Sequence, residues 1–273
     1  MRIQHNMTAA NTNRQLGITT GNLSKSTEKL SSGYAINRAA DNAAGLKISE
    51  KMRGQIRGLE QASTNAEDGI SLVQTAEGAL NETTAILQRM RELTVQAAND
   101  TNVAADRESI SEELSQLEAE VTRIATETEF NTMKLLSGGL AGGMKLQVGA
   151  NKGQAITFAI GNMDAKSLGV EGINGKVDTH ENATEAIDTV QKALDQVTGQ
   201  RSALGAIQNR LEYTISNADN TAENLTTAES RIRDVDMAAE MVTYSKNSIL
   251  QQAAQSMLAQ ANQSTQGVLS IIG

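Results

Sequence analysis

The chain has 273 residues, with three tyrosines, two phenylalanines and no proline, cysteine or tryptophan. Because proline breaks helices, its absence over this length favours long, uninterrupted helices. The net charge of −8 and the scarcity of aromatic side chains argue against a nucleic-acid partner, and the lack of cysteine excludes a disulfide framework and a thiol nucleophile.

The N-terminal 40 residues carry leucines at intervals of seven, namely Leu16, Leu23 and Leu30. This spacing predicts a helix with an apolar stripe. The first residues lack the uninterrupted apolar segment of a secretory signal peptide. No stretch of the chain approaches the roughly 18 apolar residues of a membrane-spanning helix. We therefore expect neither a cleaved signal nor a membrane partner.

Three long helices are predicted from heptad spacing in the middle of the chain. We expect the first over residues 44–98, the second around residues 110–124 and the third over residues 181–227. Apolar residues at alternating intervals of three and four share one helix face, which packs against a neighbouring helix. The predicted core of this bundle comprises Ile56, Leu59, Ile70, Val73, Leu114, Leu117, Leu194 and Leu211.

The periodicity changes between the second and third helices. Apolar and polar residues alternate over residues 144–148 and 156–160, on either side of an Asn-Lys-Gly turn. This pattern predicts one β-hairpin near residues 144–160. The glycine-rich segments before and after it, residues 138–143 and 161–176, are typical of a hinge or turn and of a loop.

The C-terminal segment predicts a helix with an apolar stripe on one face and glutamine and serine side chains on the other. The stripe includes Leu250, Met257, Leu258 and Ile271. Such a helix is marginal in water when isolated, because most helical stability comes from packing. We therefore expect the two chain ends to pair as a coiled coil and to pack against other copies of the chain.

Together these elements predict a mainly α fold, an elongated rod of long antiparallel helices with one β-hairpin. A helix of about 54 residues is roughly 80 Å long, whereas a compact globule of this length has a radius of gyration of roughly 18 Å. A rod exposes long flanks, so self-assembly is the natural expectation.

Side chains suited to catalysis or metal binding are few. The two histidines, His5 and His180, lie in no metal-ligand spacing, and paired carboxylates such as Glu112-Glu113 are typical of a charged helix face. Arg201 and Gln208 interrupt an apolar seam, where polar residues set the register of helix pairing. We expect no enzyme, and no catalytic residue, cofactor or metal site.

Longer runs of sequence carry a family resemblance. Leu30-Ser-Ser-Gly-Tyr-Ala-Ile-Asn-Arg38 and Leu87-Gln-Arg-Met-Arg-Glu-Leu93 closely resemble the N-terminal region of bacterial flagellin. Ala228-Glu-Ser-Arg-Ile-Arg-Asp-Val-Asp-Met237 and Met257-Leu-Ala-Gln-Ala-Asn262 resemble its C-terminal region. The resemblance covers about residues 1–136 and 185–273. One departure is Tyr34-Ala35, where flagellins commonly have Leu-Arg.

The resemblance implies two domains. Residues 1–43 plus 231–273 would form the terminal coiled-coil domain called D0, and residues 44–230 would form the helical bundle with a hairpin called D1. Only the hairpin and a glycine-rich loop occupy the place where many flagellins insert outer variable domains, so the chain looks like a minimal flagellin. The implied function is self-assembly into the extracellular flagellar filament for swimming motility, by coupled folding of both termini.

The same resemblance implies partners. These are other copies of the chain, a flagellar secretion chaperone at the C-terminal segment, and the flagellar cap and hook-associated proteins. Export would run through the flagellar type III apparatus. In flagellins that animal cells recognise, a Toll-like receptor contacts D1, and the matching positions are Arg89, Leu93 and Glu113. The sequence leaves two alternatives open, a flagellin-like hook–filament junction protein and a cytoplasmic coiled-coil scaffold.

Overall fold

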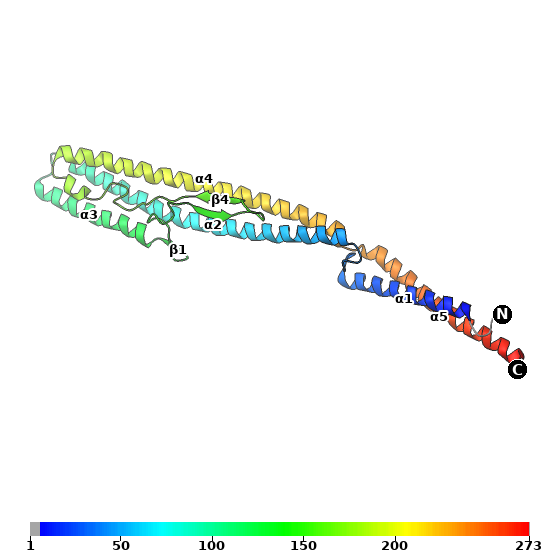
Figure 1. Cartoon of the computed structure of the whole chain (residues 1–273). Coiled ribbons are helices and arrows are strands. Elements are labelled where there is room, and N and C mark those ends of the chain that lie inside the picture. Colours follow the sequence, from blue (N-terminus) through cyan, green and yellow to red (C-terminus); the bar gives the residue numbers. More distant parts are fainter. Residues whose placement is uncertain (1–5, 273) are drawn as a thin grey trace. The chain divides into compact units, whose positions relative to one another are not determined.

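The computed structural model describes the backbone of residues 6–272 and the side chains of residues 6–264. Within that part the chain forms five α-helices and two short antiparallel hairpins (Figure 1). The mainly α fold is confirmed. The helices are α1 (Met7–Ser32), α2 (Ala43–Ala97), α3 (Ala104–Glu127), α4 (His180–Arg233) and α5 (Met237–Ile272).

The segment between α3 and α4 contains all of the described strands. They are β1 (Glu129–Phe130), β2 (Met133–Lys134), β3 (Met144–Gln147) and β4 (Ala155–Phe158), followed by the 3-10 helix η1 (Ile173–Lys176). The predicted hairpin is confirmed as β3–β4, with Leu146 opposite Ile156. The β1–β2 hairpin was not expected. The predicted loop after β4 is well packed, since Val170 and Ile173 are fully buried.

The chain forms two compact units. One contains the residues up to Gln55 and those from Glu223 onward, and the other contains Ile56–Ala222. The first therefore reaches further along α2 and α4 than the predicted limits at residues 43 and 231. Arg233 at the end of α4 binds Glu50 near the start of α2, so these two helix ends are joined to each other within the first unit.

In the Ile56–Ala222 unit, α2 runs antiparallel to both α3 and α4. Arg89 on α2 pairs with Glu113 on α3, and Ser63 on α2 donates a hydrogen bond to Asp219 on α4. Leucine, isoleucine, valine, methionine and alanine side chains from all three helices form one continuous core with the inner face of the β3–β4 hairpin. The heptad pattern supplies this core because it places one apolar stripe on each helix.

The predicted bundle-core residues occupy two environments. Val73, Leu114, Leu194 and Leu211 are buried in the core. Ile70 and Leu117 are half-buried and pack against it. Ile56 and Leu59 are also half-buried, and Leu59 lies beside Val148 and Ile156 of the hairpin region.

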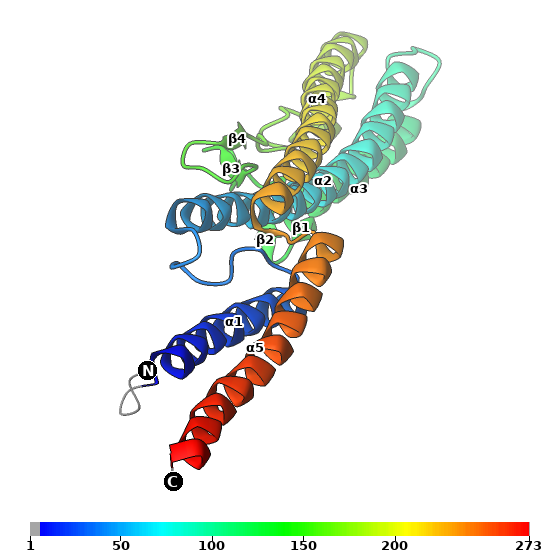
Figure 2. The same ribbon diagram turned by 90° about the vertical axis from the view of Figure 1, so that its right-hand side faces the viewer.

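The other unit contains the pair of terminal helices, α1 and α5. They lie side by side in both views (Figure 1, Figure 2). Their direction is antiparallel, because Asn6 donates a hydrogen bond to the carbonyl oxygen of Ala261 while Lys29 pairs with Glu240. The side chains buried along this pair are small or polar, namely Thr19, Ser26, Asn247, Ala254 and Ala261. Small side chains allow two helix backbones to approach closely.

Candidate assembly surfaces

Helix α5 has a second apolar face that the chain itself leaves uncovered. Val242 and Ile249 are 71% and 66% exposed, and Leu250 and Met257 continue the same surface. At 100° per residue Val242 and Ile249 project to a different side of α5 from Asn247 and Ala254, which face α1, and Leu250 and Met257 lie between these two sides. One side of α5 is therefore covered by α1, and another is open to a partner.

Helix α1 has the same two-sided character. Thr19 and Ser26 are buried in the helix pair, whereas Met7 and Ile18, eleven residues apart and on one face, are exposed. The predicted packing residues follow this division. Leu16, Leu23, Leu30 and Leu258 are half-buried, Leu250 and Met257 are exposed, and the side chain of Ile271 lies outside the described residues.

Exposed large apolar side chains concentrate in the unit that holds the terminal helices. Ten of the fourteen found among residues 6–264 belong to it, and four belong to the Ile56–Ala222 unit. Apolar side chains that gather on one exposed surface mark interaction sites. The ten are Met7, Ile18, Tyr34, Ile48, Met237, Met241, Val242, Ile249, Leu250 and Met257.

A polar clamp holds the segment that follows α1 against the end of α4. The Arg233 guanidinium lies 4.8 Å from the centre of the Tyr34 ring and donates a 2.6 Å hydrogen bond to Glu50. This bond lowers the pKa of the Glu50 carboxyl, because it stabilises the ionised form. Backbone hydrogen bonds from Ala35 to the Arg233 oxygen and from Val235 to the Gly33 oxygen complete the contact.

The predicted receptor-contact residues do not form one exposed patch. Arg89 and Glu113 are exposed and joined by a 2.9 Å ion pair, and the pKa of Arg89 is raised because Glu113 accepts its hydrogen bond. Leu93, by contrast, is only 2% exposed and belongs to the bundle core. The reason is its heptad position, which directs the side chain toward α3 and α4.

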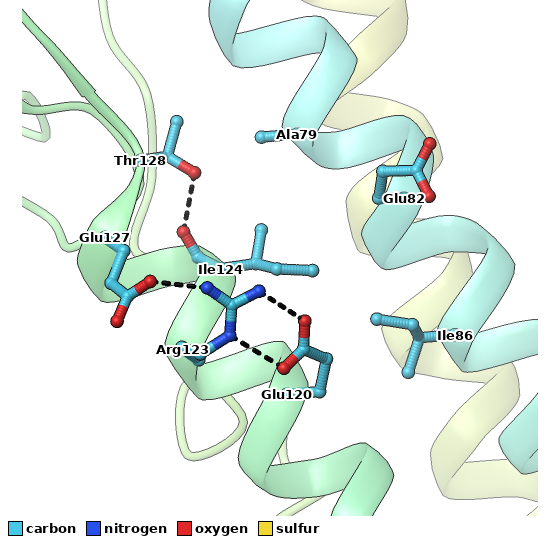
Figure 3. A pocket seen from close by; sticks show the side chains of 8 residues that line it. All are labelled: Ala79, Glu82, Ile86, Glu120, Arg123, Ile124, Glu127 and Thr128. Carbon is cyan, nitrogen blue, oxygen red and sulfur yellow. Dashed lines mark hydrogen bonds and ion pairs between the residues drawn. The ribbon is translucent and has the colours of Figure 1, made fainter.

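A groove lies between α2 and α3 (Figure 3). Its floor is apolar, formed by Ala79 and Ile86 from α2 and by Ile124 from α3. Arg123 donates hydrogen bonds to Glu120 and Glu127 at 2.6 Å and 2.5 Å. Both carboxylates raise the pKa of Arg123, because they stabilise its charged form. The rim of the groove is therefore acidic and its floor apolar.

Neither a metal-binding cluster nor a membrane-spanning helix is found in the described part of the chain. Residues 6–272 contain no cluster of three acidic or histidine side chains placed to hold a metal ion. None of the described helices is long and apolar enough to cross a bilayer. The fold and the uncovered apolar helix faces define a structural protein that associates through its helices.

The particular family follows from the comparisons with known proteins. The model of the bacterial flagellin N-terminal helical region matches residues 3–141, and that of the C-terminal helical region matches residues 187–272. The chain belongs to the bacterial flagellin family. The N-terminal match includes α1, α2 and α3, and the C-terminal match includes most of α4 and all of α5.

Full-length relatives agree with this assignment. Flagellin of Halalkalibacterium halodurans is 53% identical over 272 residues, and flagellin of Bacillus subtilis is 50% identical over 303 residues; each alignment covers 100% of both chains. The crystal structure of Bacillus cereus FlgL covers 65% of this chain and 97% of its own, with a TM-score of 0.52 and 16% identity. That likeness concerns the fold alone. The chain is a flagellar filament subunit, and its family is a structural one.

Proposed function

We propose that this chain builds the extracellular flagellar filament by polymerising through the second apolar faces of α1 and α5. The observation that carries the proposal is the exposed stripe of Val242, Ile249, Leu250 and Met257. Fully burying a side chain of this size stabilises an interface by about 1.5–3 kcal/mol. Several such side chains on one helix, repeated in every copy, provide the driving force for a homopolymer whose rotation drives swimming.

Coupled folding of the two termini is the second part of the proposal. The α1–α5 contact buries threonine, serine, asparagine and alanine side chains, which contribute little apolar area. Ordering a residue costs about 1–2 kcal/mol, so this pair gains most of its stability when neighbouring copies cover the remaining faces. Confining that step to the growing end of a filament prevents polymerisation elsewhere.

The experiment is seeded growth of filaments from purified protein, followed by electron microscopy. Val242→Ser combined with Ile249→Ser should abolish elongation, whereas Thr243→Ser, at an exposed position on the same turn as Val242, should not change it.

Removing residues 247–273 should also abolish elongation and leave the Ile56–Ala222 unit folded, as judged by circular dichroism. Normal filaments from the Val242/Ile249 variant would overturn the proposal. Growth that stops after a thin layer would indicate a hook–filament junction protein.

The exposed stripe of α5 also supports the proposed partners. A secretion chaperone that covers the C-terminal segment would shield Val242 and Ile249 before export through the flagellar type III apparatus. The cap and the hook-associated proteins would meet the same surfaces at the two ends of the filament. Because the chain has no cysteine, a single Ile249→Cys variant can carry a crosslinker. Crosslinks to one small cytoplasmic protein before export would support the chaperone, and their absence would contradict it.

Arg89 and Glu113 remain the proposed contact for a host Toll-like receptor. Both are exposed and lie at facing positions on α2 and α3. Leu93 is buried beneath them and would act by holding the helices in place. Receptor signalling should fall with Arg89→Ala and stay unchanged with Arg91→Ala, at an exposed position on the same helix. Equal signalling from both variants would contradict the contact.

A further inference from the structure

The α2–α3 groove has an exposed glutamate on its rim that forms no ion pair among the described residues. Three carboxylates, from Glu82, Glu120 and Glu127, surround the apolar floor, and only Arg123 opposes them. Arg123 is already bound to Glu120 and Glu127. Glu82, on the α2 side of the groove in Figure 3, takes part in no ion pair within residues 6–264. The groove therefore offers an apolar slot beside a free negative charge.

A complementary feature lies on α4. Tyr213 is 78% exposed, the largest exposed fraction among the large apolar side chains of the described residues. Arg210 precedes it by three residues, so both side chains lie on one helix face. Arg210 is exposed and, within the described residues, its guanidinium forms no ion pair. An aromatic ring beside a free cation is a surface typical of protein–protein interfaces.

The groove and Tyr213 cannot meet within one chain. Ser63 contacts Asp219, so Tyr213, six residues earlier on the antiparallel α4, lies near the level of Gly69 on α2. The groove is centred near Glu82. The two levels differ by about 13 residues, or roughly 20 Å at 1.5 Å per residue. Any contact between these surfaces must join two copies.

We infer that Tyr213 of one copy enters the α2–α3 groove of a second copy, with Arg210 paired to Glu82. The ring would cover Ile86 and Ile124, and its hydroxyl would donate a hydrogen bond to the acidic rim. Because the two surfaces differ, the contact is heterologous, and a heterologous contact that does not close into a ring generates a helical filament. The inference rests on the proposed function and adds a specific contact outside the terminal helices.

The contact also defines a stagger between neighbouring copies. If the two bundles lie parallel, Tyr213 reaches the groove only when one copy is displaced by roughly 20 Å along the bundle. A filament reconstruction should therefore place α4 of one subunit against α2 and α3 of a neighbour with that displacement. A reconstruction in which Tyr213 faces solvent would overturn the inference.

A charge exchange tests the proposed ion pair. Arg210→Glu and Glu82→Arg should each raise the critical concentration for seeded growth by about tenfold or more. The double variant should restore it to near the wild-type value, because the pair is re-formed with reversed signs. The matched control is Lys192→Glu, which reverses a charge at an exposed position of α4 away from Tyr213. Equal effects of Arg210→Glu and Lys192→Glu, or no rescue in the double variant, would overturn the inference.

Crosslinking tests the same contact without relying on growth rates. The chain has no cysteine, so copies carrying Tyr213→Cys can be mixed with copies carrying Glu82→Cys. Oxidised filaments should yield disulfide-linked dimers, and the unpolymerised mixture should not. Replacing Glu82→Cys by Ser71→Cys, elsewhere on α2, should remove the product. Failure of the wild-type chain to elongate seeds would contradict the proposed function, whereas normal elongation without the dimer would contradict only this inference.

Discussion

The guanidinium of Arg233 lies over the ring of Tyr34, 4.8 Å from its centre. Tyr34 stands just after α1 and Arg233 ends α4, so one contact joins segments about 200 residues apart in sequence. A tyrosine at this position gives Arg233 a cation–π partner in addition to Glu50.

Tyr34→Ala should weaken the unit that holds the terminal helices. Loss of the cation–π contact and of the ring's packing should lower its free energy of unfolding by about 1 kcal/mol. Tyr213→Ala is the matched control, because that ring is exposed and makes no such contact within residues 6–264. Hydrogen exchange should accelerate around residues 33–50 and 230–240 only in the first variant. Equal exchange in the two variants would show that the clamp contributes nothing.

The ion pair between Glu50 and Arg233 predicts a pH dependence. Arg233 lowers the pKa of Glu50 in the folded chain, with a smaller contribution from Arg53. The stabilisation is therefore present above the pKa of the unfolded chain and is lost as the pH falls through the lower folded value. In an NMR titration the pKa of Glu50 should rise in Arg233→Ala, and rise less in Arg53→Ala. The reverse order would contradict this account.

Periodicity predicted the bundle well because three long helices contribute one apolar stripe each to a single core. It predicted the terminal pair less well. Leu16, Leu23 and Leu30 suggested a leucine-based seam, yet the buried positions are small and polar residues such as Ser26 and Ala254. A pattern of apolar residues shows which helix faces favour packing. It does not show which of two such faces packs within the chain and which remains exposed. The β1–β2 hairpin was missed because two-residue strands are too short to alternate.

Gly58 is required where the β3–β4 turn approaches α2. A Cβ atom at this position would lie 2.8 Å from the Ala150 Cβ and 3.2 Å from its Cα. Gly58→Ala should therefore displace the turn and lower the free energy of unfolding by about 1–3 kcal/mol. Gly78→Ala, on the same helix in open space, should instead raise it by up to about 1 kcal/mol, since alanine is the better helix former. Urea unfolding of both variants gives the comparison, and the same sign for both would refute it.

The β1–β2 turn contains a strained residue. Asn131 and Thr132 both have positive φ, at 47° and 64°, and a β-branched side chain is disfavoured in that region. Thr132→Gly should remove the strain and raise the free energy of unfolding by about 1 kcal/mol. The same substitution in the middle of a helix, Thr221→Gly, should lower it by a few tenths of a kcal/mol or more. Thermal unfolding would distinguish the two, and a destabilised Thr132→Gly would contradict the strain.

The close approach of α1 and α5 depends on Ala254, which is buried between them. Ala254→Leu should force the helices apart, and overpacking of this kind costs about 1–3 kcal/mol. Ala253→Leu is the matched control, because Ala253 precedes Ala254 and is exposed. We expect Ala254→Leu to leave the melting temperature of the Ile56–Ala222 unit unchanged and to prevent seeded filament growth, while Ala253→Leu disturbs growth less. If Ala254→Leu elongated seeds at the wild-type rate, the small-residue contact between α1 and α5 would not be needed in the assembled state.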